Sequence, residues 1–250
     1  MLKLLCKLAQ KATTSKKIIF NPTSSLAKLT VPAPKPAKEY LPDWYVSAPP
    51  FFTKKPKFSL ETGRPNPTFK MCMPFLDTLT MGYIQETWTD IFIEEKDGEI
   101  YFYYPSGPAP MKSREETISD IMPVSSGFYK TQYTWGPPWM PQLPRGYSFI
   151  LTHPLNRTDL PFQTLTGIVD GDSFTQSEEG SNIPFMIKEG FTGVIKKGTP
   201  MYQIIPFKRD NWKSVNAEYD ENAQLKIVQG IKQYFWGAYK KLHWSEKKFK

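Results

Sequence analysis

Residues 144–209 constrain the fold most, because they alternate short apolar runs with turn-forming residues. The runs are rich in Ile, Val, Phe and Tyr, and Gly, Pro, Asn and Asp lie between them. Such bounded β-branched and aromatic runs are typical of strands, and several in succession are typical of a compact all-β unit. The chain also contains 24 prolines in 250 residues, about twice average usage, which disfavours long helices. We therefore expect a mainly β core.

Composition divides the chain into three parts. Residues 1–57 form a basic, Pro-rich N-terminal arm in which no Asp or Glu occurs before Glu39. Residues 58–213 are expected to form the all-β core, and residues 214–250 a C-terminal helix and basic tail. The acid-free start, with apolar residues at helical spacing between lysines, suits a mitochondrial transit peptide, although transit peptides favour Arg. We favour the other interpretation, a basic arm that is solvated or lies on a neighbouring chain.

The second half of the arm offers large apolar anchors despite its prolines. Proline removes backbone donors and fixes extended geometry, so this segment is expected to run extended. A plain linker has no need of large apolar side chains. We therefore expect the segment to lie on another surface through Leu41, Trp44, Tyr45, Phe51 and Phe52. The sequence leaves open whether that surface belongs to the same chain or to a second one.

Residues 66–104 carry the patterns of a first folded piece. They predict one helix or turn and then three strands, over 74–79, 83–86, 90–94 and 99–104. Asp97-Gly98, between the last two strands, is a strong hairpin signal, because both residues tolerate the positive φ of a tight two-residue turn. Glu94 and Glu95 are neighbours in a strand and point to opposite faces, so we expect a solvated hairpin rather than a pair of catalytic carboxylates.

The C-terminal part predicts an amphipathic helix. Between residues 225 and 242, apolar side chains recur every three or four residues, which is the period of one helix face. Gly230 and Gly237 lower the stability of an isolated helix by about 1 kcal/mol each, so the helix is expected to need a partner surface. Phe235 and Leu242 are expected to contact that surface, on the β core or on another subunit. An aromatic-rich basic helix also suits a membrane surface.

Trp135 and Trp139 lie among prolines, where two indoles make large, rigid contact surfaces. We expect them at an interface or covering an open sheet. The alternative is a platform on which the bases of a single-stranded nucleic acid stack.

The residue types argue against several kinds of site. Cys6 and Cys72 provide no disulfide framework and no zinc set, so neither a metal nor a cofactor is expected. His153 and His243 are far apart in the sequence, which leaves a nucleophilic catalytic arrangement to a coincidence of folding. No apolar run approaches the length of a membrane span. The net charge of +8 favours an anionic neighbour, whether nucleic acid, membrane or an acidic protein surface.

The chain contains the segments KMCMPFLDTLTMGY, TWGPPWMPQLPRGYSFILTHPLNRTDLPFQTLTGIVDGDSF and KKGTPMYQIIPFKRDNW. They resemble a protein family encoded by tailed phages, often marine ones, and by some bacteria. The likeness spans roughly residues 40–213. It implies a genomic setting and no particular activity.

The order GYSFILTHPLNRTDL, GIVDGDSF and IKKGTPMYQII is similar to the second, third and fourth motifs of the dUTPase and dCTP-deaminase superfamily. This resemblance implies a distorted β-barrel, the β-clip, and usually a trimer with sites shared between subunits. It places Asp170 at the carboxylate that activates water, Arg157 near a phosphate-binding arginine and Gln203 at a retained glutamine. The chain departs from the family at Ser173, where a tyrosine lines the base pocket, and at Thr199, where the family has Asp. The glycine-rich closing motif is missing.

These departures decide the expected function. Triphosphate chemistry needs several partners for anionic oxygens at once, and the chain lacks most of them. We expect no enzyme but a structural or assembly protein of a phage particle, in the virion or, during assembly, in the host cytoplasm. It would bridge neighbouring subunits through its arm and helix, with other virion proteins and its own copies as partners. The alternatives are a dUTPase-like protein that binds or hydrolyses a nucleotide, and a nucleic-acid binder that uses the basic termini.

Overall fold

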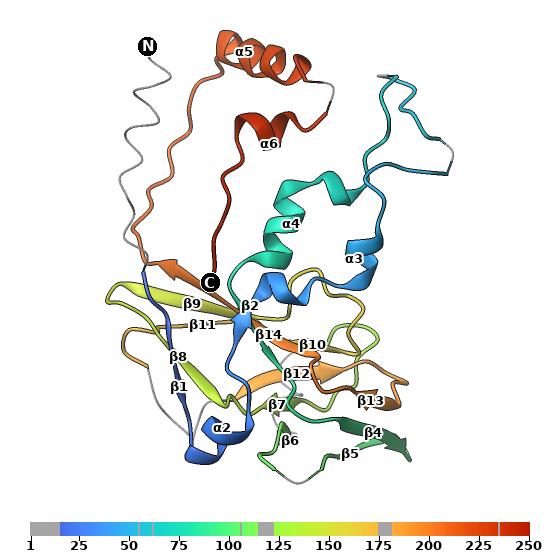
Figure 1. The fold of residues 1–250 in the computed structure, drawn as a ribbon, viewed down its shortest axis with the longest axis vertical. Coiled ribbons are helices and arrows are strands. Elements are labelled where there is room, and N and C mark those ends of the chain that lie inside the picture. The colour runs from blue at the N-terminus through green and yellow to red at the C-terminus, as the bar shows by residue number, and fades with distance from the viewer. Residues whose placement is uncertain are drawn as a thin grey trace.

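The computed structural model describes residues 16–54, 56–61, 63–105, 107–114, 123–174, 182–234 and 236–250 (Figure 1). The architecture is mainly β, and every strand pairing in the described part is antiparallel. The described strands form sheets of five, four, three and two strands. The predicted β-rich core is confirmed at this level, whereas no closed barrel is found among these strands.

The five-stranded sheet is built around β14, the longest of the described strands. Its order is β11-β9-β14-β3-β2, with bounds of Gly167–Val169, Tyr147–Thr152, Pro200–Lys208, Tyr83–Glu86 and Lys35–Pro36. The first six residues of β14 are all buried. A nearly continuous apolar run is what a strand covered on both faces requires.

The remaining strands form three smaller sheets. The four-stranded sheet has the order β10-β12-β7-β6, with bounds of Phe162–Thr164, Ile183–Ile187, Tyr133–Trp135 and Met111–Ser113. The three-stranded sheet is β13-β4-β5, at Gly193–Ile195, Ile91–Lys96 and Glu99–Tyr103. The last sheet pairs β1, Ile19–Pro22, with β8, Trp139–Gln142. The three strands predicted over 83–104 therefore match β3, β4 and β5 to within two residues.

The β4–β5 hairpin turns at the predicted place. Asp97 and Gly98 have φ angles of 55° and 82°, as both central residues of a type I′ turn must have positive φ. The hairpin lies at one end of the long axis of the molecule, and the C-terminal helices lie at the other (Figure 1).

The N-terminal segment packs on the chain's own strands. Within it lie β1, α2 at Ser25–Thr30, β2, the 3-10 turn η1 at Ala37–Tyr40 and α3 at Asp43–Ser47. β1 pairs with β8 and β2 pairs with β3. Beyond the strands, Trp44 Nε1 donates to Asp159 Oδ1 at 3.3 Å and Tyr40 Oη donates to Glu86 Oε2 at 2.6 Å. The surface beneath this part of the arm thus belongs to the same chain, while residues 1–15 lie outside the described residues.

A short helix precedes β3 where the sequence predicts it. This helix, α4, spans Met73–Thr80 and follows the 3-10 turn η2 at Phe69–Met71. Tyr45 of α3 is buried there, with its ring centroid 6.3 Å from that of Phe69 and 6.0 Å from that of Phe75. The aromatic residues of the arm therefore anchor it to α4.

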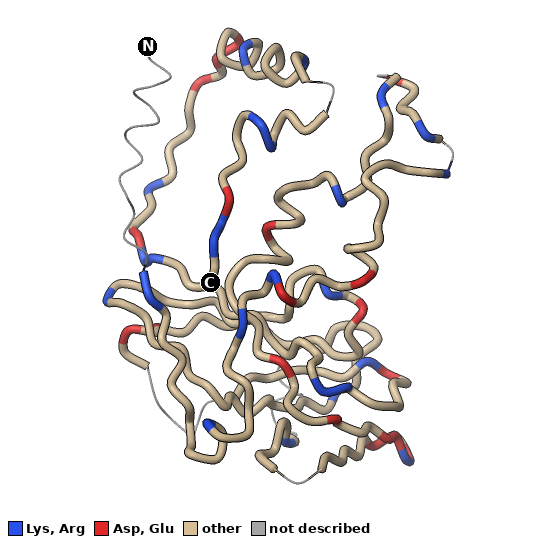
Figure 2. The backbone as a smooth tube through the Cα atoms, viewed as in Figure 1, with Lys and Arg blue, Asp and Glu red and all other residues tan. Residues whose placement is uncertain are grey.

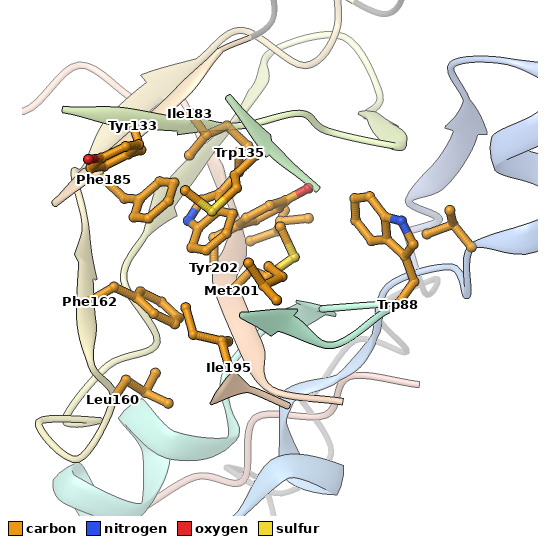
Figure 3. Packing of buried hydrophobic residues seen from close by; sticks show 14 of the residues in the cluster. Trp88, Tyr133, Trp135, Leu160, Phe162, Ile183, Phe185, Ile195, Met201 and Tyr202 are labelled. Carbon is orange, nitrogen blue, oxygen red and sulfur yellow. The ribbon is translucent and has the colours of Figure 1, made fainter. Parts of the chain in front are cut away.

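Trp135 lies inside the hydrophobic core (Figure 3). Its ring stacks on Phe185, with centroids 3.6 Å and planes 3° apart, and Phe162 meets its edge at 5.0 Å. Its Nε1 donates to Thr164 Oγ1 at 3.1 Å, and that hydroxyl donates to the carbonyl oxygen of Met201 at 2.8 Å. A buried indole satisfied in this way is part of the core. The expectation of Trp135 at an interface is corrected, because none of its surface is exposed.

The C-terminal part forms two helices where the sequence predicts one. α5 spans Glu221–Lys232 and α6 spans Ala238–Leu242. α5 already ends at Lys232, and Gly237, the residue before α6, has a left-handed φ of 70° that a continuous right-handed helix does not contain. Neither helix contains a buried residue, and both stand away from the sheets (Figure 1). No helix in the described part of the chain is long and apolar enough to cross a membrane.

The last residues return to the body of the molecule. Trp244 Nε1 donates to both carboxylate oxygens of Asp77 of α4, at 3.1 and 3.0 Å. Tyr83 Oη of β3 donates to the carbonyl oxygen of Lys250 at 3.2 Å. Residues 210–243, which we call the C-terminal excursion, thus leave the sheets after β14 and return at Trp244. Between these points the excursion meets the segment before α4, where Arg64 Nη1 donates to the carbonyl oxygen of Tyr234 at 3.4 Å.

Candidate functional site

Asp170 lies in a cluster of charged residues that three strands bring together. β11 and β9 pair Val169 with Phe149, so the next residue, Asp170, meets Ser148. β14 ends beside the start of β9, which places Arg209 at the same point. Asp170 Oδ1 accepts hydrogen bonds from Ser148 Oγ at 2.6 Å and from Arg209 Nη1 at 2.9 Å. The carboxylate predicted to activate water is thus the partner of an arginine that the motif comparison did not single out.

Asp172 binds the same arginine. Arg209 Nη1 donates to Asp172 Oδ1 at 3.0 Å, and Nη2 donates to Oδ2. The backbone N–H of Gly146 also donates to Oδ2, at 2.8 Å. The bonds from Arg209 and Gly146 lower the pKa of Asp172 to about 2, and those from Ser148 and Arg209 lower the pKa of Asp170. A general base that works near neutral pH needs a raised pKa, so both carboxylates are poorly suited to that role.

We expect this cluster to make the protein sensitive to acid. A carboxyl group whose pKa is lower in the folded state contributes stability that is complete above its unfolded pKa of about 3.9 and is lost as the pH falls through the folded value. For Asp172, with a folded pKa of about 2, the loss runs from about pH 4 down to about pH 2. Denaturant unfolding at stepped pH should show this fall. Arg209→Gln should be less stable at neutral pH and lose less over the same window, and an unchanged profile would contradict the assignment.

Gln203 is a structural residue. It is 1% exposed, and its side-chain oxygen accepts a hydrogen bond from the N–H of Leu155 at 2.8 Å. Its Nε2 donates to the carbonyl oxygens of Thr78 at 3.0 Å and Met81 at 2.5 Å. Because both donor hydrogens and the amide oxygen are engaged, Gln203 ties β14 to the C-terminal end of α4 and offers little to a ligand.

Arg157 is also engaged within the chain. Its Nε donates to Asp159 Oδ1 at 2.9 Å and its Nη2 donates to Asp159 Oδ2 at 2.8 Å. Its Nη1 donates to the carbonyl oxygen of Tyr40 at 3.3 Å. The N–H of Thr164 donates to Nδ1 of His153 at 3.3 Å, so Nε2 carries the proton and donates to the carbonyl oxygen of Arg157 at 2.9 Å. Burial lowers the pKa of His153 and keeps this ring neutral. The arginine therefore fastens the arm to the core.

The three residues predicted for nucleotide chemistry do not form one site. Asp170 contacts Ser148 at the start of β9, whereas Gln203 pairs with Thr152 at its end. These positions lie about 13 Å apart along the strand, at about 3.3 Å per residue. A site shared between subunits would have to use these three side chains, and each of them is already hydrogen-bonded within its own chain. The described residues also contain no group of three or more His, Cys, Asp or Glu that could hold a metal ion.

The predicted interface residues differ in how much surface they keep. Trp139 Nε1 donates to the carbonyl oxygen of Val31 at 3.2 Å, which secures the end of α2. Phe51 packs edge-on against Trp236, with centroids 5.7 Å apart. Phe52 and Leu242 remain 54% and 42% exposed.

The other predicted interface residues lie closer to the chain's own body or outside the described part. Leu41 and Trp44 are half-buried, and Tyr45 is 3% exposed. Phe235 lies outside the described residues. Beyond residue 47, then, Phe52 and Leu242 are the predicted anchors that keep most surface for a partner.

An apolar cavity of about 170 Å³ lies beneath Trp139, and sequence reasoning missed it. Its wall includes Phe149 and Leu151 of β9 and Tyr202 and Ile204 of β14. The i, i+2 spacing within each pair predicts that the two side chains share a sheet face. No local pattern in the sequence predicts that a cavity remains between this face and β8. Among the residues that the structure describes, no charged side chain lines the cavity, so they offer no charge-assisted hydrogen bond to the phosphates of a nucleotide.

The cluster around Asp170 is therefore best described as a clasp that fixes the end of β14 to the start of β9. Both carboxylates are ionised and hydrogen-bonded to Arg209. Among the described residues, the cluster contains neither an unpaired base nor a group of metal ligands. In comparisons with known proteins, no family model matches the chain and no curated protein matches it.

Proposed function

We propose that this chain is a non-enzymatic assembly protein, a structural component of a phage particle, that joins neighbouring copies through its C-terminal excursion. One observation carries the proposal. The excursion displays large apolar side chains that are almost fully exposed, with Trp212 at 90%, Val215 at 81% and Tyr219 at 79%. Three such side chains within eight residues of the sequence are suited to contact with another protein.

The helix that follows supports the same interpretation. α5 has 12 residues and no buried side chain, and Leu225, Ile227 and Ile231 are 44–49% exposed. An isolated helix of this length is marginal in water and takes most of its stability from packing. A surface on another molecule would supply that packing.

The N-terminal arm enters the proposal differently. Residues 19–47 are used within the chain, where they pair with β8 and β3 and pack on α4. We therefore assign the bridging role to the C-terminal excursion. The particle setting is supported by the sequence resemblance to phage-encoded proteins, and mass spectrometry of purified virions tests it. Stoichiometric copies are expected, and absence from the particle would count against this setting.

The dUTPase-like alternative is the less favoured function, since Asp170, Arg157 and Gln203 are all bonded within the chain. Incubation with a panel of nucleoside triphosphates should give neither hydrolysis nor thermal stabilisation. Either result would restore the alternative. Asp170→Ala is expected to lower stability, because it removes the carboxylate that accepts hydrogen bonds from Ser148 and Arg209. Under the proposed function, the substitution changes no catalytic activity.

We expect Trp212→Ser combined with Tyr219→Ser to abolish most self-association without destabilising the fold. Both side chains are about four-fifths exposed or more, so their loss removes little intramolecular contact. Sedimentation velocity over a concentration series measures the association, and denaturant unfolding measures the stability. The matched control is Phe58→Ser, a 55% exposed aromatic outside the excursion. Association that survives the double substitution would contradict the proposed role of the excursion.

A further inference from the structure

The β13-β4-β5 sheet presents an aromatic face to solvent. Phe92 and Tyr103 are directly paired between β4 and β5, and Val194 of β13 is paired with Phe92. Tyr101 lies two residues from Tyr103 on the same face. Phe92, Tyr101 and Tyr103 are 42%, 48% and 52% exposed, whereas the other face of β4 is buried in the core. The outward face of a half-buried antiparallel sheet is normally polar, so this aromatic face is suited to an interaction.

The same face is acidic at its tip. Glu94 follows Phe92 and Glu99 precedes Tyr101 at i, i+2 spacing, so these exposed carboxylates share the aromatic face. Lys96 lies on the same face, directly paired with Glu99, so the face itself carries two carboxylates and one lysine. Counting both faces and the turn, residues 94–99 contain four acidic side chains and one basic one, on a chain whose net charge is +8. Figure 2 shows the acidic residues gathered at the end of the β4–β5 hairpin. A partner for this face should be apolar and basic.

The helices of the C-terminal excursion have this chemistry. α5 begins with the acidic residues Asp220, at its N-cap, and Glu221, and the rest of the two helices, residues 222–243, contains four lysines and no acidic residue. Their exposed apolar side chains include Leu225, Ile227 and Ile231. The hairpin and these helices lie at opposite ends of the long axis, so they are too far apart to meet within one molecule (Figures 1 and 2).

We propose that the aromatic, acidic face of β13-β4-β5 in one copy receives the α5–α6 helices of a second copy, head to tail. This inference rests on the proposed function and names its receiving surface. The two surfaces differ, so the contact is heterologous, and repeated contacts either close a ring or continue as a filament. Opposite charges on the two surfaces steer their encounter, and added salt weakens it.

A charge exchange tests the pairing. One variant carries Glu94→Lys and Glu99→Lys, and the other carries Lys226→Glu and Lys232→Glu, all at exposed positions. Each should weaken self-association of the full chain about tenfold or more at low salt, because it sets like charges against each other. A chain with all four substitutions, or an equal mixture of the two variants, should regain the association. Glu189→Lys, an exposed change elsewhere, is the control and should have no effect.

The outcomes separate this inference from the proposed function. A wild-type chain that stays monomeric at every concentration overturns both. A wild-type chain that associates, with both reversed variants associating equally well, overturns the head-to-tail pairing and leaves the proposed function standing. Weakening without recovery in the four-substitution chain or in the mixture also overturns the pairing, because recovery depends on contact between the two exchanged surfaces.

Discussion

Gly82→Ala is expected to unfold the protein or to leave it barely stable. A Cβ at this position would lie 2.1 Å from the carbonyl oxygen of Ile204 and 3.0 Å from its carbonyl carbon. Both are backbone atoms of the buried strand β14, so no side chain can rotate away. The residue also has a φ of 73°, which costs a residue with a Cβ about 1 kcal/mol or more. Relief of the overlap requires separating β3 from β14, and a loss on the order of 4–5 kcal/mol is a large part of a typical domain's stability.

Gly198→Ala is the matched control for this substitution. Gly198 has a φ of 86°, close to that of Gly82, but a Cβ there would meet no atom within 4 Å. Gly198→Ala should lower the free energy of unfolding by only about 1 kcal/mol, the cost of a left-handed backbone at a residue with a Cβ. Denaturant unfolding of both variants gives the comparison. Equal losses in the two variants would show that the approach to Ile204 is not what makes Gly82 necessary.

The parts of the fold that local patterns specify could be predicted from the sequence. The β4–β5 hairpin depends on Asp97-Gly98 and on flanking alternation, and both signals lie within a dozen residues. The helix over 74–79 was likewise predicted within one residue at each end. The long C-terminal helix was predicted less well, because the period of its apolar residues continues past Lys232, where α5 ends, and past Gly237, where the backbone is left-handed.

The candidate site depends on contacts between distant parts of the chain, which local patterns do not reveal. The motif order singled out Asp170, which directly follows β11. Its main partner, Arg209, is 39 residues away and is brought there by the register of β14 against β9. Trp135 and Trp139 looked alike among their prolines, yet they belong to different sheets. Trp135 enters the core through β7, whereas Trp139 lies on β8 beside the apolar cavity.

The docking of the arm has the same cause. The aromatic residues near Trp44 predicted a contact surface, but its identity depends on Asp159, 115 residues further along the chain. No residue near Trp44 carries that information. The structure shows that the surface belongs to the same molecule, and this moves the question of assembly to the C-terminal excursion.

Trp135→Ala should lower the free energy of unfolding by about 3–5 kcal/mol, the range found when a buried aromatic residue is truncated. The indole is fully buried, it stacks on Phe185, and its loss leaves a cavity between two sheets. The Thr164 hydroxyl still donates to the carbonyl oxygen of Met201, but it no longer accepts the hydrogen bond from the indole N–H.

Trp212→Ala is the matched comparison for the core tryptophan, because it deletes the same side chain where it is 90% exposed. Its loss should change the stability of the monomer by no more than about 0.5 kcal/mol, as at other exposed positions. Denaturant unfolding at a protein concentration where the wild type is monomeric measures both variants. A large loss in Trp212→Ala would mean that the excursion packs on the body in solution, and the surface proposed for assembly would then be already occupied. A small loss, together with weaker self-association, would separate the residue that builds the fold from the one that joins its copies.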